Sequence, residues 1–237
     1  MDRRAKADTL RRLHLEPPIL VLPNAWDVAS AKQLGALRGC RALATTSAAV
    51  ARSLGWEDGE QAPVEEMLRA NERIAAAVDL PVTADLEHGY GDPVGTARRA
   101  WDAGLVGMNF EDSTDDEHVP LDEQVAMIRA IGDAVPELVI NARVDVFIRE
   151  TGGVDEAVER GNAYLAAGAA CVYPIGCPVS AVADLARRID GPINVLVIPG
   201  MPEPYELQNL GVARMTWGSG LATAAYAEAV RIAAAAL

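Results

Sequence analysis

Acidic side chains gather where apolar segments of the sequence end. In the stretch LPVTADLEHGYGDP, an apolar run ends at Asp85 and Glu87, and a turn with two glycines follows. The stretch NFEDS places Glu111 directly after another apolar run. Like charges brought close together repel unless a cation or a proton lies among them. Oxygen ligands without His or Cys suit Mg²⁺, or Mn²⁺ in its place, better than Zn²⁺. The three acids together predict a magnesium site, although each alone could instead cap a helix or pair with Arg98 or Arg99.

Arg143, in the stretch VINARVD, is the expected receiver of an anionic substrate. A guanidinium can hold a carboxylate through two parallel hydrogen bonds. The competing interpretation is a structural ion pair with Glu111 or Asp145. The run TTSAAVA, which begins at Thr45, offers small residues whose backbone N–H groups could approach a ligand oxygen.

Two histidines are candidate acid–base groups by residue type alone. His88 follows the Asp85 segment, and His118 lies in the stretch EDSTDDEHVPLDEQ. Each could equally be an ordinary loop or surface residue. The stretch TWGSGLA resembles a phosphate-cradling turn at the start of a helix, with a plain turn as the simpler interpretation, and Tyr173 is expected in the core.

These residues need a scaffold that brings strand ends together. Several stretches repeat one pattern, in which an amphipathic run ends in Ala-Gly or Leu-Gly and a short apolar strand follows. The pattern predicts eight strands, at 19–23, 41–45, 81–85, 106–110, 138–142, 170–173, 193–197 and 212–216. It predicts helices at 27–35, 63–78, 93–103, 121–134, 154–167, 179–189, 203–210 and 220–236.

Eight strand–helix units predict an α/β fold, a (β/α)8 TIM barrel, as a single domain over residues 1–237. An open doubly wound sheet is the alternative, but no GxGxxG follows the first strand. In a barrel of this kind the polar residues at the carboxyl ends of the strands meet at one mouth.

The composition narrows the class of partner. The net charge of −13 and a pI near 4.6 argue against nucleic acid and anionic membranes as partners. Three scattered cysteines indicate neither a disulfide framework nor a metal motif. The charged start lacks the apolar core of a signal peptide, and no apolar run is long enough to span a membrane. The cytoplasm is the expected location.

Six stretches together resemble the isocitrate lyase/phosphoenolpyruvate mutase superfamily over nearly the whole chain. They are PNAWD, ATTSAAVARSLGWED, ADLEHGYGD, NFEDS, NARVD and PINVLVIPG, and they occur in the family's order and spacing. The resemblance implies a (β/α)8 barrel, Mg²⁺, and α-keto or 2-hydroxy acid substrates whose C–C or C–P bond breaks through an enolate-like intermediate. It also implies a homo-oligomer, a dimer or tetramer, in which the last helix is exchanged between subunits.

The resemblance also implies roles for individual residues. Asp85 resembles the acid nearest the metal, with Glu87 and Glu111 holding the ion through water and Asp58 as a further acid of the site. Arg143 resembles the arginine that binds the substrate carboxylate. The remaining substrate contacts implied are Thr45, Thr46, Ser47 and Asn194.

The loop after Glu111 departs from the family. It contains neither the cysteine of the lyases nor the lysine of the C–P enzymes, which argues against isocitrate or methylisocitrate lyase activity and leaves water or His118 to deliver a proton. The sequence therefore predicts a Mg²⁺-dependent lyase that breaks a C–C bond in a small α-keto or 2-hydroxy (di)carboxylic acid, similar to an oxaloacetate decarboxylase. The alternatives are a phosphonopyruvate hydrolase or mutase, and a non-catalytic barrel that binds keto acids.

Overall fold

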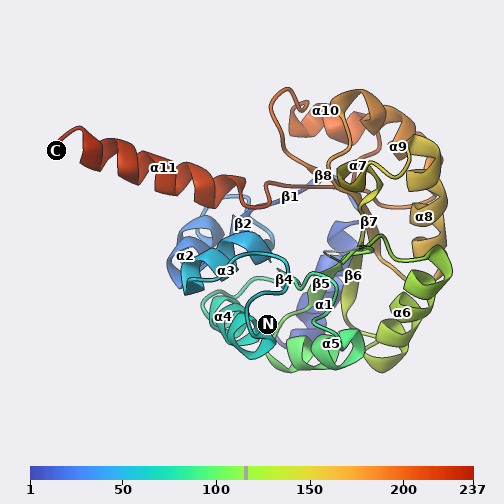
Figure 1. Cartoon of the computed structure of the whole chain (residues 1–237), viewed down its shortest axis with the longest axis horizontal. Helices are drawn as coiled ribbons and strands as arrows, with labels where there is room; N and C mark the ends of the chain where they lie inside the picture. The colour runs from blue at the N-terminus through green and yellow to red at the C-terminus, as the bar shows by residue number, and fades with distance from the viewer. Residues whose placement is uncertain (115–116) are drawn as a thin grey trace.

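The computed structural model describes residues 1–114 and 117–237, and its strands form a closed parallel barrel (Figure 1). Within the described residues the strand segments are β1 (Leu20–Leu22), β2 (Asn24–Ala25), β3 (Leu43–Thr45), β4 (Val82–Asp85), β5 (Gly107–Phe110), β6 (Val139–Val144), β7 (Cys171–Pro174), β8 (Asn194–Leu196) and β9 (Arg214–Thr216). Strands β2 to β7 pair in order, and β8, β9 and β1 form the rest of the wall. The predicted (β/α)8 fold is confirmed.

Two junctions close the barrel. The first strand of the sequence prediction is divided at Pro23, so that β1 pairs with β9 on one side and β2 pairs with β3 on the other. Proline lacks an N–H donor, yet its carbonyl still accepts a hydrogen bond of 3.0 Å from the Ala44 N–H. At the opposite junction, a bridge between Val172 and Ile193 joins β7 to β8.

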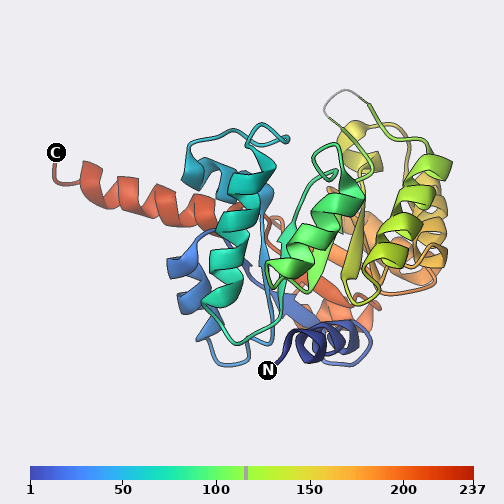
Figure 2. The same ribbon diagram turned by 90° about the horizontal axis from the view of Figure 1, so that it is seen from below.

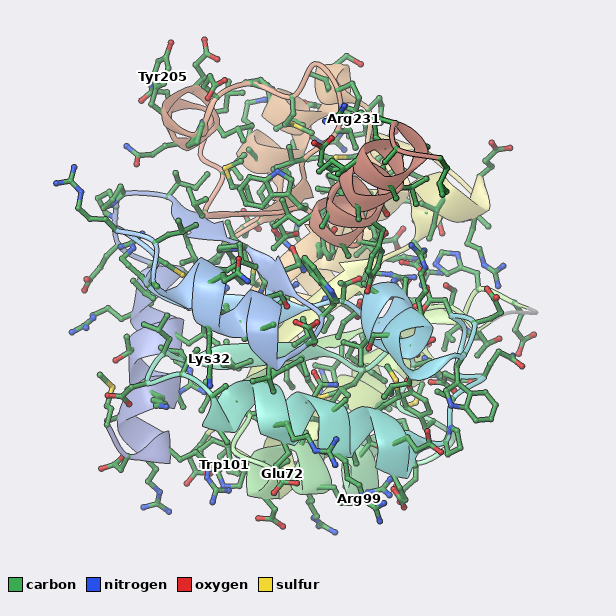
Figure 3. The ribbon with its side chains drawn as sticks, turned by 90° about the vertical axis from the view of Figure 1, so that its left-hand side faces the viewer. Lys32, Glu72, Arg99, Trp101, Tyr205 and Arg231 are labelled. Carbon is green, nitrogen blue, oxygen red and sulfur yellow. The ribbon has the colours of Figure 1, made fainter. Side chains whose placement is uncertain are left out.

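Helices surround the barrel wall (Figures 1 and 2). Their bounds are α1 (Arg3–Leu13), α2 (Val28–Gly35), α3 (Ser47–Leu54), α4 (Val64–Ala76), α5 (Pro93–Asp102), α6 (Leu121–Ala134), α7 (Val146–Arg149), α8 (Val154–Ala166), α9 (Val182–Arg188), α10 (Pro204–Asn209) and α11 (Gly220–Ala234). Local signals explain several starts. Asp27 forms a capping box with Ser30, and Asp92 caps α5, which begins with proline. Polar side chains such as Glu72 and Arg99 lie on the outer surface (Figure 3).

Helix α1 was not predicted, and it covers the end of the barrel opposite the site. Its residues Ala7, Leu10 and Leu13 pack against Leu20 and other interior residues. Figure 2 shows α1 at one end of the molecule and the segment that follows α3 at the other. Gly107 allows this packing, because a Cβ there would lie 3.0 Å from the Leu10 side chain and 2.8 Å from Thr83 Oγ1. The carboxyl ends of the strands therefore form the open mouth.

Helix α11 projects away from the barrel (Figure 1). From Thr223 to the end of the chain every residue is exposed, including Tyr226, Val230 and Ile232. Among the helices of the described residues, none has the length and apolarity needed to cross a bilayer.

Candidate active site

Asp85 ends β4 and faces the barrel mouth with its carboxylate held on both sides. The Ser47 backbone N–H and hydroxyl each donate to Asp85 Oδ2 at 3.1 Å, and Asn109 Nδ2 donates to Oδ1 at 3.3 Å. The Asp85 backbone N–H donates to Thr45 Oγ1 at 3.2 Å. Ser47 is the first residue of α3, a helix that was not predicted. The small residues of the TTSAAVA run therefore lie at a helix N-terminus, which favours anions.

Glu87 belongs to a hydrogen-bonded ring with Glu60 and Tyr90. Tyr90 Oη donates to Glu87 Oε1 at 2.5 Å, and the Glu60 N–H donates to Oε2 at 2.6 Å. The Tyr90 N–H donates to Glu60 Oε1 at 2.7 Å. All three residues have a positive φ, between 51° and 58°, a strained conformation that is uncommon for non-glycine residues and clusters at functional sites. Burial, with Asp58 and Asp85 nearby, raises the pKa of Glu87 to about 7.

The turn that follows Glu87 requires its first glycine. Gly89 has a φ of +92°, and a Cβ there would lie 2.6 Å from the Pro93 Cα. The two glycines therefore let the backbone fold back sharply from the Asp85 strand into α5.

Arg143 bridges two carboxylates at the mouth. Its Nε donates to Asp145 Oδ1 at 2.5 Å and its Nη2 to Oδ2 at 2.7 Å, while Nη1 contacts Glu111 Oε1. The structural ion pair considered as the alternative is therefore present with both acids. Burial raises the pKa of Glu111, and Arg143 opposes this shift. A guanidinium has five N–H donors, so two remain for a ligand.

Two adjoining cavities open at the mouth. The outer one, of about 580 Å³, is lined among others by Glu87, Glu111 and Arg149. The inner one, of about 200 Å³, is lined by Asp85 and by residues of β7, β9 and the α3 N-terminus. Asp58 and Arg143 line both. Asp58 lies at the rim, where partial loss of contact with water, and after it the charge of Asp85, raises its pKa.

Thr46 and Ser47 line the inner cavity, whereas Thr45 and Asn194 lie behind it. Thr45 supports the Asp85 backbone, as described above. Asn194 is fully buried and donates to Thr216 Oγ1 at 3.4 Å, and Thr216 in turn lines the cavity. The structure therefore brings the predicted substrate contacts together, but it places Thr45 and Asn194 one layer away from the cavity wall.

His118 lines neither of the two cavities described above. Its Nε2 is 3.2 Å from Asp112 Oδ2, and its Nδ1 is 3.1 Å from Thr151 Oγ1. Asp112 is fully buried, and its Oδ2 also accepts a hydrogen bond of 2.7 Å from Tyr164 Oη. His118 thus contributes to a buried polar cluster behind Asp145, which argues against the predicted acid–base role. His88 does line the outer cavity, with Nδ1 2.8 Å from the Glu111 carbonyl and its ring stacked on Phe110.

The acids at the mouth fit a hard cation bound mainly through water. In the described part of the chain, no three His, Cys, Asp or Glu side chains approach closely enough to ligate one ion directly. Mg²⁺ commonly keeps several waters and takes only one or two carboxylates. Burial raises the pKa values of Glu87 and Glu111, and repulsion from neighbouring acids adds to this, so a cation placed among these carboxylates would favour their ionised forms.

Sequence reasoning missed several residues of the site. Glu60 and Tyr90 complete the ring around Glu87, and their only sequence signal is proximity to Asp58 and to the paired glycines. Tyr173 is buried, as expected, and it also lines the inner cavity. The turn at 216–219, for which a phosphate-cradling turn and a plain turn were both considered, lines the same cavity. The Trp217 N–H of that turn donates to Asn24 Oδ1 at 2.8 Å.

Comparison with known proteins agrees with this geometry. A family model described as phosphoenolpyruvate phosphomutase matches residues 10–237. An uncharacterized protein of Mycobacterium tuberculosis (strain ATCC 25618 / H37Rv) is 37% identical over 226 residues, which are 91% of this chain and 85% of that protein. The 2-methylisocitrate lyase of Bacillus subtilis (strain 168) is 33% identical over 223 residues, 86% of this chain and 73% of the lyase.

Among solved structures, a Burkholderia cenocepacia J2315 protein assigned provisionally as a lyase/mutase superposes with a TM-score of 0.91 at 34% identity. The superposition covers 98% of this chain and 89% of the other. The match of the family model over almost the whole sequence, together with these relatives, shows that the chain belongs to the phosphoenolpyruvate mutase/isocitrate lyase superfamily of lyases and mutases.

Proposed function

We propose that this protein is a Mg²⁺-dependent lyase that breaks a C–C bond in a small α-keto or 2-hydroxy (di)carboxylic acid, with oxaloacetate decarboxylation as the simplest reaction of this class. The observation that carries the proposal is the inner cavity. It is lined by the Asp85 carboxylate, the Arg143 guanidinium and the α3 N-terminus at Thr46 and Ser47. A 2-oxo acid offers the complementary groups, a carboxylate and a keto oxygen, on adjacent carbons.

In this proposal Asp85 is the acid nearest the cation, and Glu87, Glu111 and Asp58 hold it through water. Bound there, Mg²⁺ would supply positive charge toward the keto oxygen as that oxygen becomes an enolate. Mn²⁺ is the expected substitute. The fixed hydrogen bonds from Ser47 and Asn109 to Asp85 would keep its carboxylate oriented between turnovers.

Arg143 and the α3 N-terminus hold the substrate. The two N–H donors that Arg143 does not spend on Glu111 and Asp145 are available to the substrate carboxylate. The ion pairs fix the guanidinium, so that little ordering is needed when the substrate binds. Thr46 and Ser47 lie on the other side of the same cavity.

The reaction on oxaloacetate balances with a proton from water as the only further input. The C3–C4 bond breaks, the carboxylate leaves as CO₂, and the electron pair of the bond forms the pyruvate enolate. The enolate carbon then takes a proton, which we assign to water because His118 lies in the cluster with Asp112.

A C–P bond enzyme, a phosphonopyruvate hydrolase or mutase, is the second candidate. Arg149 lines the outer cavity beside Glu111, and a guanidinium there suits a phosphonate as well as a second carboxylate. The matching family model is also named for a phosphomutase.

Helix α11 supports a homo-oligomer, a dimer or tetramer. Its exposed apolar residues Tyr226, Val230 and Ile232, and the terminal Leu237, would be covered by a second copy of the chain. Arg231, which Figure 3 labels on this helix, pairs with Glu228 and adds a polar edge.

The test is a product assay with Mg²⁺ on oxaloacetate, phosphonopyruvate and a panel of C3 to C6 keto and hydroxy acids. The proposal predicts Mg²⁺-dependent pyruvate formation from oxaloacetate or cleavage of a related acid, lost in Asp85→Ala and kept in the control Asp102→Ala, whose side chain is exposed. Phosphate release from phosphonopyruvate alone would favour the C–P enzyme. Metal-dependent oxalate binding without turnover on any acid would favour a non-catalytic binder.

A further inference from the structure

A buried arginine lies inside the barrel beneath the candidate metal site. Arg214, on β9, is 1% exposed, and it is the largest of the fully buried side chains. In the described part of the chain it forms no ion pair, its Nε has no hydrogen-bond partner, and Nη2 donates to Asn109 Oδ1 at 3.4 Å. Burying a guanidinium without a carboxylate partner is costly, so its retention in the interior calls for a compensating role.

Arg214 is linked to Asp85 through a single side chain. Asn109 accepts from Arg214 Nη2 and, at 2.8 Å, from Asn141 Nδ2, and it donates through its own Nδ2 to Asp85 Oδ1. A guanidinium only donates and a carboxylate only accepts. The Asn109 amide therefore has one orientation that satisfies both neighbours, with oxygen toward Arg214 and nitrogen toward Asp85.

Electrostatics agree with this linkage. Burial lowers the pKa of Arg214, and its interactions with Cys171, Tyr173 and Asp85 oppose that shift. The positive charge of Arg214 also contributes, after burial, to lowering the pKa of His14 to about 3 at the closed end of the barrel. His14 is thus neutral, whereas Arg214 carries a positive charge that interacts with Asp85.

We propose that Arg214 is a positioning residue, which fixes the Asn109 amide and through it the orientation of the Asp85 carboxylate toward the cation. This inference rests on the proposed metal role of Asp85. Arg214 does not contact the cation or Asp85 directly. Its effect on Asp85 is transmitted through two hydrogen bonds, one from Arg214 to Asn109 and one from Asn109 to Asp85.

The sign of one measurement separates this role from a simple charge effect. A cation close to a metal site repels the metal, so removing Arg214 by charge alone would tighten metal binding. Removing a residue that orients a ligand weakens binding instead, by about tenfold to a hundredfold for outer partners of metal ligands.

The experiment measures Mn²⁺ affinity by electron paramagnetic resonance on the full chain, with folding checked by circular dichroism. The variants are Arg214→Met, Arg214→Lys, Asn109→Leu and the double variant Arg214→Met/Asn109→Leu. The matched control is Met215→Leu, because Met215 is the next residue on β9 and packs in the hydrophobic core. We expect about tenfold to a hundredfold weaker binding in Arg214→Met and Asn109→Leu, partial recovery in Arg214→Lys, and a double variant no weaker than the weaker single variant.

Unchanged or tighter Mn²⁺ binding in folded Arg214→Met would overturn the inference, as would a double variant whose loss equals the product of the single losses. If Arg214→Met does not fold, the Mn²⁺ affinity of Asn109→Leu decides the question. Wild-type affinity in that variant would overturn the proposed link through Asn109. A wild-type protein that binds no Mn²⁺ would overturn the proposed function itself, and the inference with it.

Discussion

The hydrogen bond from Tyr90 to Glu87 offers a quantitative test of the site. Tyr90→Phe removes the donor, 2.5 Å from Glu87 Oε1, and leaves the ring in place. This donor favours the ionised carboxylate, and it opposes the effect of burial, which raises the pKa of Glu87 to about 7. A hydrogen bond to a charged group contributes about 1.5–3 kcal/mol. Since about 1.4 kcal/mol corresponds to one pH unit, its loss should raise the pKa of Glu87 further.

The assay is Mn²⁺ affinity measured as a function of pH. If ionised Glu87 helps to hold the cation, affinity in the wild type rises as pH increases through about 7. In Tyr90→Phe the midpoint of this rise should move up by about one to two pH units, while the alkaline plateau changes little. The control is Tyr205→Phe, because Tyr205 is 65% exposed on α10 (Figure 3) and lines neither cavity at the mouth.

Two results would refute the reasoning. A midpoint that stays in place would show that Glu87 does not take part in cation binding. A midpoint that moves to lower pH would show that Tyr90 does not stabilise the carboxylate.

Three further outcomes are expected. Arg143→Lys, which loses the forked donor geometry, should lower kcat/KM for the substrate by about 10- to 100-fold, mainly through KM; an unchanged KM in steady-state kinetics would contradict this. Folding raises the pKa of Glu87 from 4.5 to about 7, so between these pH values the folded protein keeps a proton on Glu87 that the unfolded chain has released. The free energy of unfolding should therefore fall as pH rises through this range, by about 3 kcal/mol in all from this group. Urea unfolding should show that Glu87→Gln flattens this decline, and equal slopes would be inconsistent with it. Gly89→Ala should destabilise the fold by on the order of 1–3 kcal/mol, because of its φ of +92° and the nearby Pro93 Cα; thermal unfolding at the wild-type temperature would argue otherwise.

The barrel could be predicted because its signals are local. Several strands follow a helix that ends in Ala-Gly or Leu-Gly. The apolar runs between Gly104 and Phe110 and between Gly168 and Tyr173 are signals that lie within about ten residues of sequence. The acids at the strand ends could also be found, because in a parallel barrel those ends share one mouth.

Interactions between distant segments could not be predicted in the same way. Helix α1 is rich in charged residues, and the role of its apolar residues Leu10 and Leu13 is clear only once the barrel end that they cover is known. The sequence could not choose between a substrate and an ion pair for Arg143, and the structure shows the ion pairs. In the sequence Arg214 is only one residue of a predicted strand, and its hydrogen bond to Asn109 could not be predicted because the two residues are 105 positions apart.

Oxalate binding measured by calorimetry tests the central claim most directly, namely that acids from neighbouring strands hold one divalent cation that binds a 2-oxo acid. The account predicts that metal-stripped protein binds oxalate only after Mg²⁺ is added, and that Asp85→Ala, checked for folding, binds none in either condition. Equal oxalate binding with and without Mg²⁺, or wild-type binding by Asp85→Ala, would contradict it.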